Sequence, residues 1–355
     1  MKRTTIKDVA REAGVSLSTV NKALTGKKGI SKELKQKVLD TVERLDYKIN
    51  RVAGSLARST IRIGIIIPSD WEDYYSDICD GIAYEMDNMV DLKVEGVTLK
   101  YATKEKDSEK QVLDAFRKME REKIRAIIFC HDNYSTYESA VEFATRQNIT
   151  VICIGIGLRD RFAKFSTVIE IDAYKCGRIA AEYLENCLPE NSGVAVMLGS
   201  KSVMPHAEKL RGFSDRIKES GKLRLCATIE TEDDDRASES LTYELIRKKK
   251  PDGIYVATGA VSGVCRAVSE SGKAMKIIAT DLSADCRNYI KKDIVSATLY
   301  QNTFAQGIVA VDMLYKHFST EARLPEKLLV APVLFTRECL PEEGKKVTLT
   351  TIADF

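Results

Sequence analysis

Hydrophobic residues in the first 45 positions recur every three to four residues, in three short runs that each begin at a capping residue. Thr5 and Asp8 have the spacing of a capping box, Gly14 supplies a turn, and Ser16 and Ser31 precede the second and third runs. The positions expected to face inward are Ile6, Val9, Ala10, Ala13, Val20, Ala23, Leu24, Leu34, Val38, Leu39, Val42 and Leu45. The pattern predicts an all-α helix-turn-helix headpiece, the arrangement that places one short helix in the DNA major groove, and a generic three-helix core is the alternative.

After residue 60 the pattern changes to short continuous apolar runs that alternate with amphipathic stretches. Continuous apolar runs are typical of parallel strands buried on both faces, and their alternation with helices indicates βαβ units. The predicted strands are 63–68, 92–99, 126–130 and 150–154, then 194–198, 225–229, 253–256 and 276–279. The predicted helices are 74–89, 106–121, 137–147, 174–187, 204–220, 236–249, 260–272 and 283–292. The sequence therefore predicts an α/β core of two doubly wound parallel-sheet subdomains.

The second predicted helix offers polar side chains to DNA on the face opposite its apolar positions. Lysine can donate to guanine, asparagine can pair with adenine through two hydrogen bonds, and leucine can contact a thymine methyl group. We therefore expect Leu17, Ser18, Asn21 and Lys22 to read base edges. Ser16, Thr19 and Ser31 are candidates for phosphate or sugar contacts, although Ser16 and Ser31 are equally suited to capping helices.

The charge distribution supports this division of the chain. The whole chain has a formal net charge of +3, yet residues 1–60 alone carry +8, which leaves −5 on the remainder. A basic head on an acidic body is typical of a DNA-binding module joined to a domain with another task.

Composition excludes several other classes of protein. There is no apolar run long enough to span a membrane and no apolar leader, and the nine cysteines lack a Cys-x-x-Cys pair, so we expect a cytoplasmic protein with reduced thiols. The three histidines lack metal-ligand spacing, and the sequence lacks a nucleophile elbow and a phosphate-binding loop. The acidic run 232–235 is interpreted as a solvated loop. These observations predict no metal, no cofactor and no enzymatic activity.

The run from Thr5 to Leu24, followed by Tyr47, Asn50, Ala53, Leu56 and Ala57, resembles the headpiece and hinge helix of the lactose-repressor (LacI/GalR) family of bacterial transcription regulators. The resemblance adds Thr5, Asn50, Ala53 and Leu56 to the DNA-binding set. It implies a hinge that is helical only on operator DNA, with Leu56 wedged into the minor groove. Ile49 replaces the family's usual proline, and Gly54 weakens the hinge helix, so both favour a hinge that orders on DNA.

The resemblance also implies an effector-binding core whose chain passes three times between two halves, here near 158–166, 293–297 and 322–330. The resulting expected division is a headpiece (1–47), a hinge (48–60), a first subdomain, a second subdomain and a tail (341–355) without leucine heptads. The first subdomain comprises 61–160 and 296–322, and the second comprises 165–293 and 328–340.

Effectors of such folds bind beyond the carboxyl ends of the strands. The residues that the strand ends and the resemblance place there are Trp71, Tyr74, Tyr75, Asp132, Lys209, Asp281 and Gln301. Trp71 is the only tryptophan, and packing at a helix start is its alternative role. Lysine at 209, where the family often has arginine, can donate but cannot form a planar two-point clamp.

Together these features predict an effector-controlled transcription regulator, a repressor that binds a pseudo-palindromic operator as a homodimer. The expected effector is a monosaccharide, a sugar alcohol or a related polyol, and whether it induces or co-represses is open. Two alternatives are kept: the same regulator controlled by a protein partner, and a solute-binding protein for transport.

Overall fold

A computed structural model describes residues 5–25, 29–45, 60–69, 72–103, 107–130, 137–155 and 166–341. The hinge 48–59 and most of the predicted tail, 342–355, lie outside these residues. Among the described residues, no helix combines the length and the apolar character needed to cross a bilayer.

The headpiece consists of α1 (Ile6–Ala13), α2 (Leu17–Thr25) and α3 (Lys32–Arg44), as the sequence predicted. The Asp8 carboxylate accepts hydrogen bonds from the backbone N–H (2.9 Å) and the hydroxyl (2.6 Å) of Thr5, which fixes the start of α1. Gly14 ends α1 with a φ of 67°. The small shared core contains Val9, Ala10, Ala13, Val20, Ala23 and Val38.

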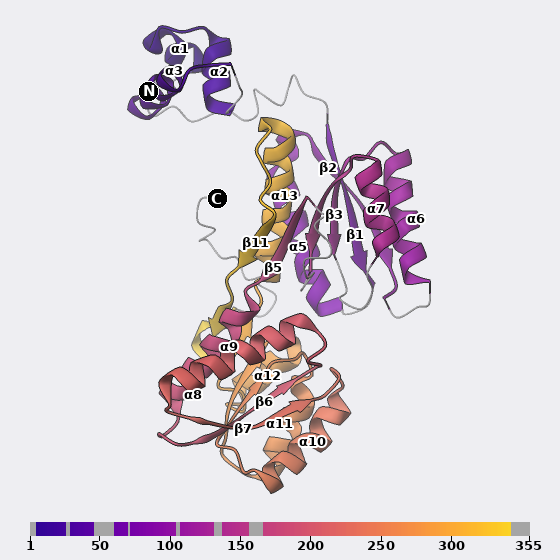
Figure 1. Cartoon of the computed structure of the whole chain (residues 1–355), viewed down its shortest axis with the longest axis vertical. Helices are drawn as coiled ribbons and strands as arrows, with labels where there is room; N and C mark the ends of the chain where they lie inside the picture. Colours follow the sequence, from indigo (N-terminus) through magenta and orange to yellow (C-terminus); the bar gives the residue numbers. More distant parts are fainter. Residues whose placement is uncertain are drawn as a thin grey trace.

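The remaining chain forms two six-stranded sheets (Figure 1). The first has the order β11-β5-β4-β3-β1-β2 and the second the order β12-β10-β9-β8-β6-β7. The first sheet contains β1 (Ile61–Pro68), β2 (Val94–Tyr101), β3 (Ala126–Cys130), β4 (Thr150–Ile154), β5 (Thr167–Ile171) and β11 (Lys327–Val330). The second contains β6 (Gly193–Leu198), β7 (Arg224–Glu230), β8 (Gly253–Val256), β9 (Lys276–Thr280), β10 (Ala297–Tyr300) and β12 (Val333–Phe335). All neighbouring strands are parallel except β10 and β12.

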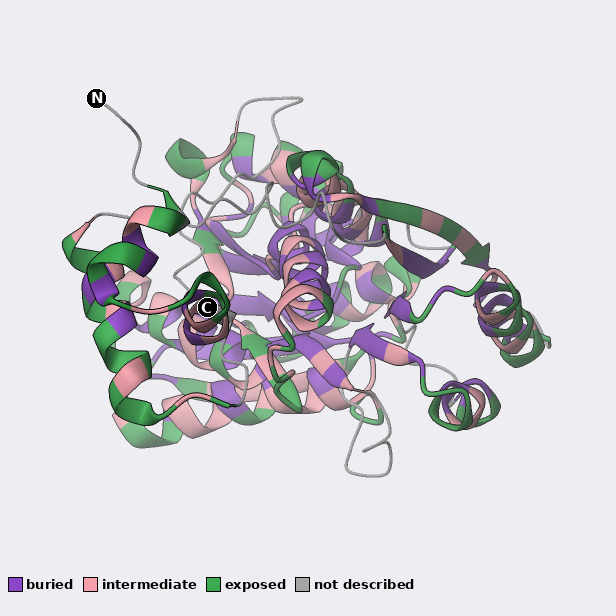
Figure 2. Ribbon diagram, turned by 90° about the horizontal axis from the view of Figure 1, so that it is seen from above, coloured by how far each residue is buried: buried purple, intermediate pink, exposed green. Residues whose placement is uncertain are grey.

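Helices cover both faces of each sheet, so the strands are buried and the outer helix faces are exposed (Figure 2). On the first sheet, one face carries α5 (Glu72–Asn88) and α13 (Thr303–Thr320), and the other carries α6 (Ser108–Arg121) and α7 (Glu138–Arg146). The helices of the second sheet are α8 (Ala173–Cys187), α9 (Met204–Ser220), α10 (Asp235–Lys248), α11 (Val261–Ser271) and α12 (Ala284–Lys291). The predicted doubly wound α/β core is therefore confirmed.

The chain passes between the sheets later than we expected. We assigned 167–171 to the second subdomain, but β5 pairs with β4 and β11 and so completes the first sheet. Likewise β10 belongs to the second sheet, although we had placed 296–322 in the first subdomain. The three crossings therefore follow β5, β10 and β11. Apolar periodicity identifies a strand but carries no information about its pairing partner, which explains the misplacement.

Close packing of α5 on α13 depends on Gly81. A Cβ atom added there would lie 2.0 Å from the carbonyl oxygen of Phe304, a backbone atom that cannot move aside alone. We expect Gly81→Ala to lower the free energy of unfolding by about 1–3 kcal/mol through overpacking. Gly259→Ala is the control, because nothing lies within 4 Å of a Cβ at that position. Urea unfolding of both variants measures the difference, and equal stability would contradict the packing argument.

Candidate DNA-binding surface and effector site

The α2 helix turns one face to its neighbours and the other outward. Val20 and Ala23 are buried against α1 and α3, whereas Leu17 is 41% exposed. Ser18 and Asn21 are also exposed, and Lys22 is partly buried. The four residues expected to read base edges thus share the outer side of α2, the geometry that a recognition helix requires.

The hydroxyl groups expected near DNA already cap helices. Ser16 Oγ accepts from the Thr19 backbone N–H at 3.1 Å and lies 2.9 Å from Thr19 Oγ1. Ser31 Oγ accepts from the Leu34 N–H at 3.2 Å, and the Thr5 hydroxyl donates to Asp8. The structure thus supports the capping role of Ser16 and Ser31. The other expected contacts, Asn50, Ala53 and Leu56, lie outside the described residues.

The carboxyl ends of the strands in the second sheet bring three of the expected effector residues into one polar cluster. Asp281 directly follows β9 with a φ of 68°, and Gln301 directly follows β10. Gln301 Nε2 donates a 2.7 Å hydrogen bond to Asp281 Oδ1. Lys209, on α9, is 3% exposed, and its Nζ lies 3.5 Å from the carbonyl oxygen of Ala257, just after β8.

Burial and neighbouring charges both act on the carboxyl group of Asp281. Burial raises the pKa of the Asp281 carboxyl group above its usual value, while Lys209 and the Gln301 hydrogen bond oppose that rise. Asp77 and Asp233 raise the pKa of Asp281 further because they add negative charge nearby. The cluster therefore combines the carboxyl group of Asp281, the amide of Gln301 and the buried side chain of Lys209.

The aromatic residues of the first subdomain occupy two different environments. Tyr75 is buried in the core under the first sheet, so its side chain serves packing. Tyr74 meets Tyr75 edge-on at 5.1 Å between ring centroids, and its buried hydroxyl lacks a hydrogen-bond partner in the described part of the chain. Asp281, Tyr300 and Asp77 add to the effect of burial in raising the pKa of Tyr74, so the charges of the polar cluster act on that hydroxyl. Trp71 and Asp132 lie outside the described residues.

Sequence reasoning missed a hydrogen-bonded bridge between the subdomains at the crossing from β10 to α13. The hydroxyls of Tyr300 and Thr303 both donate to Asp77 Oδ2, and Asp77 is on α5. The Tyr300 oxygen also accepts from the Phe304 backbone N–H at 3.0 Å. Asp77 stands three residues after Tyr74, on the same helix face, and that spacing was the available signal.

Sequence reasoning also missed a second acidic group in the cluster. Asp233 accepts a hydrogen bond from Thr258 and lies 4.0 Å from His206 Nε2. Gly199 permits this approach, since a Cβ there would lie 2.4 Å from both side chains. The acidic run 232–235 is therefore more than the solvated loop we expected, because Asp234 also caps α10 through the Ala237 N–H at 2.7 Å.

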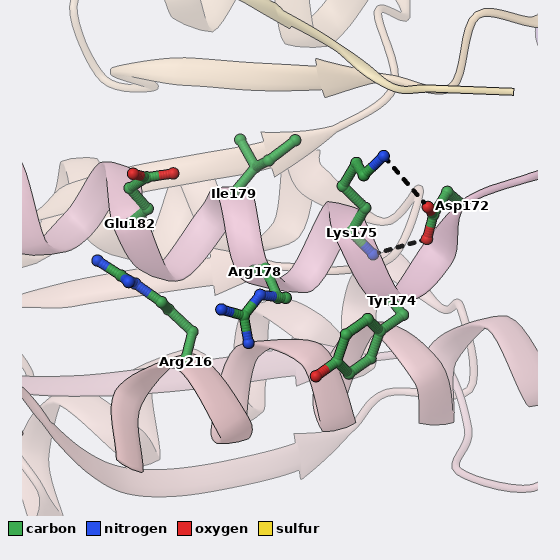
Figure 3. A pocket seen from close by; sticks show the side chains of 7 residues that line it. All are labelled: Asp172, Tyr174, Lys175, Arg178, Ile179, Glu182 and Arg216. Atoms are coloured by element: carbon green, nitrogen blue, oxygen red, sulfur yellow. Dashed lines mark hydrogen bonds and ion pairs between the residues drawn. The ribbon is translucent and has the colours of Figure 1, made fainter. Parts of the chain in front are cut away.

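A separate surface hollow of about 370 Å³ lies between α8 and α9 (Figure 3). Its arginines already have carboxylate partners: Arg178 contacts Glu219 at 2.7 and 2.9 Å, and Arg216 contacts Glu185 at 2.7 and 3.1 Å. In the described part of the chain, the charge of each arginine is therefore already balanced by a glutamate, although both arginines keep further N–H donors. Within the described ranges, no group of three or more His, Cys, Asp and Glu side chains is arranged to hold a metal ion.

Burial lowers the pKa of the His206 imidazole from 6.5 to about 4, and the nearby Lys209 charge adds to that effect. The unfolded chain therefore binds the proton first as pH falls, so this contribution to stability is complete above pH 6.5 and is lost toward pH 4. Between pH 7.5 and 5.0 it should cost about 2 kcal/mol. Urea titrations of the wild type and His206→Gln at both pH values test this, and an equal pH dependence would contradict it.

Comparison with known proteins agrees with this architecture. Residues 5–50 match the model of bacterial regulatory proteins of the lacI family, and residues 63–322 match that of the periplasmic binding protein domain. The chain is 27% identical to catabolite control protein A of Priestia megaterium, covering 89% of this chain and 93% of that protein. It is 26% identical to catabolite control protein A of Streptococcus mutans serotype c, covering 92% and 94%.

Solved structures share the fold. The Lac repressor bound to ONPG in the repressed state aligns with a TM-score of 0.62 at 20% identity, over 96% of this chain and all of that chain. A periplasmic ribose ABC transporter protein from Conexibacter woesei aligns with a TM-score of 0.72 at 14% identity, over 79% and 93%. The transport and co-regulator alternatives are not favoured. The chain belongs to the lacI family of bacterial regulatory proteins and is a ligand-regulated, DNA-binding transcription regulator.

Proposed function

We propose that this regulator is a cytoplasmic homodimeric repressor that binds a pseudo-palindromic operator and is switched by a sugar or a related polyol. The observation that carries the effector class is the hydrogen-bonded pair of Asp281 and Gln301 beside the buried Lys209. A carboxylate, an amide and an ammonium group at converging strand ends offer both acceptors and donors to vicinal hydroxyl groups.

Relatives of the fold support this effector class. A solute-binding protein from Actinobacillus succinogenes with bound D-allose aligns with a TM-score of 0.66 at 17% identity. One from Bacillus halodurans with bound myo-inositol aligns with a TM-score of 0.66 at 15% identity. We extend polyol binding to this chain because its own cluster, at the carboxyl ends of strands of the second sheet, has the donors and acceptors that hydroxyl groups need.

Dimerisation follows from the size of the headpiece. One α2 helix reads only a half-site, so two copies related by a two-fold axis are needed to bind a palindrome with useful specificity. An effector that prefers one arrangement of the two subdomains then changes how well both headpieces fit their half-sites. Sedimentation at micromolar concentration tests the dimer directly.

Asn21 should contribute to sequence-specific binding. Loss of a two-point contact with adenine costs about 1–3 kcal/mol, so Asn21→Ala should weaken binding to a selected operator about 5- to 150-fold. Binding to random duplex DNA should change little. Lys35→Ala, on the exposed face of α3, is the control, and it should weaken both kinds of binding alike. Fluorescence anisotropy on an operator selected from a random library, and on a random duplex, measures all six affinities of the wild type and the two variants. Equal losses for Asn21→Ala on both DNAs would remove Asn21 from base recognition.

Asp281 should be required for effector binding. We expect a thermal-shift screen of the full chain against neutral sugars and polyols to yield a stabilising ligand, worth about 2.7 kcal/mol at one hundred times its Kd. Asp281→Ala should abolish that shift. Asp215→Ala should retain it, because Asp215, on α9, accepts a hydrogen bond from Tyr174 on α8 and is not among the groups that act on Asp281. A ligand that stabilises Asp281→Ala equally would place the effector elsewhere, and a flat panel would overturn the sugar class.

A further inference from the structure

The first sheet receives the chain from the headpiece at the edge where β1 begins. Thr60 is exposed there, and the Ile61 N–H donates to the Lys93 carbonyl oxygen at 2.8 Å. Because β1, β2 and β3 are parallel, their amino ends share this edge, and α6 ends there too, just before β3. Figure 1 shows the headpiece beyond the same end of the sheet. Residues 46–59 tether it within about 50 Å of that edge, so bound DNA lies on this side of the core.

The turn that follows α6 is fixed beside the start of β1. Arg62 Nη1 donates to the Glu122 carbonyl oxygen at 2.8 Å, and Arg62 Nη2 lies 3.3 Å from the Glu122 carboxylate. Ala126, at the start of β3, pairs with β1 in the sheet. Lys123 stands three residues earlier, in a left-handed turn with a φ of 60°. The last residues of α6 and its turn therefore lie next to the point where the chain arrives from the hinge.

This end of α6 carries more cations than the neighbouring acids neutralise. Residues 117–125 have a net charge of +3, although the chain after residue 60 carries −5. Arg117 contacts Asp114 at 3.2 Å, and Arg125 contacts Glu120 at 3.2 Å. The other three cations are exposed and have no carboxylate partner among the described residues. They form the α6 basic end, which consists of Lys118, Arg121 and Lys123.

Stabilisation of a helix end does not account for this grouping. The helix dipole favours cations in a last turn, and other helices that end at the same edge also have them. In those helices, however, a carboxylate one turn earlier pairs with the cation. Arg146 contacts Glu142 at 2.6 Å on α7, and Lys316 contacts Asp312 at 2.7 Å on α13. Like charges that repel one another at the α6 basic end instead favour a polyanionic partner.

We propose that the α6 basic end binds the phosphate backbone of the DNA that flanks the half-site contacted by α2. This inference rests on DNA binding by the headpiece and does not depend on the effector. Lysine and arginine side chains bind phosphate oxygens whatever the base sequence, so the contact adds affinity and orientation without adding sequence specificity. It also joins the duplex directly to the first subdomain, so a movement of that subdomain acts on the DNA as well as on the headpiece.

Two lengths of operator duplex test the proposal with the full-length chain. One is trimmed to the base pairs that the headpieces protect from hydroxyl radicals, and the other is extended by about one helical turn on each side. The test variant combines Lys118→Gln, Arg121→Gln and Lys123→Gln. By fluorescence anisotropy, the wild type should bind the longer duplex about tenfold more tightly, whereas the variant should bind both alike. On the longer duplex, the slope of log K against log salt should become shallower by about 3–5 for a dimer.

A matched variant controls for the loss of net charge. Lys248→Gln, Lys249→Gln and Lys250→Gln remove the same charge from the end of α10 in the second subdomain, where Lys250 also has a positive φ, of 47°. This variant should keep the wild-type preference for the longer duplex. Neutral methylphosphonates in the flanking segments should lower wild-type affinity to that of the test variant, and they should leave the test variant unchanged.

Three results would overturn the proposal. The wild type could bind both duplexes equally, or the test variant could lose affinity equally for both, which would place the effect in the headpiece or in folding. A test variant that keeps the preference for the longer duplex would leave the α6 basic end to an acidic protein partner. Failure of the wild type to bind even the trimmed operator would instead contradict the proposed repressor function.

Discussion

The carboxylate of Asp77 joins the two halves of the core. It accepts the hydroxyl protons of Tyr300 and Thr303, which lie where the chain leaves the second sheet and begins α13. Asp77 is on α5, in the first subdomain, so this one group anchors the crossing to a helix that also carries Tyr74. Because carboxylates make stronger hydrogen bonds than neutral acceptors, the crossing has a defined geometry on which the effector cluster depends.

The crossings after β5 and β10 are related by internal repetition. Each crossing leads into a helix that is preceded by an aspartate or asparagine, with an aromatic residue two positions later and a glycine five positions later. The first copy is Asp172, Tyr174 and Gly177, and the second is Asn302, Phe304 and Gly307. The copies differ at the first position: Asp172 caps α8 through the Lys175 N–H at 2.9 Å, whereas Asn302 has a φ of 55° and a buried Oδ1 without a partner among the described residues. In the first copy, the side chain at this position therefore serves as a helix cap. The second leaves polar groups open beside the effector cluster, consistent with strain and unmet hydrogen bonds gathering at functional sites.

Local signals in the sequence predicted the helices and strands, but they did not predict which strands pair with one another. The headpiece followed from caps and apolar spacing, and strands such as β3, β4 and β8 were placed at their exact bounds because continuous apolar runs end sharply. The sheet membership of β5 and β10 was misjudged, since hydrophobicity does not name a pairing partner. In the site, Asp281 was predicted because it follows a predicted strand, and Gln301 was predicted from the resemblance to the family. His206 and Asp233 were overlooked because they are distant in sequence. Their side chains meet only in the folded chain, where Gly199 leaves room for both.

A regulatory ligand must bind one arrangement of the subdomains better than the other, since equal affinity shifts no equilibrium. Asp281, Asp233 and Lys209 all belong to the second subdomain, so contacts with these groups alone would supply affinity without a switch. Tyr74 differs, because it belongs to α5 and its hydroxyl lies within electrostatic reach of Asp281. A hydroxylated ligand that contacts both residues would sense the separation of the subdomains directly. Tyr74 would then be the group of the first subdomain through which the ligand senses that separation, on the same helix as the Asp77 that holds the crossing from β10 to α13.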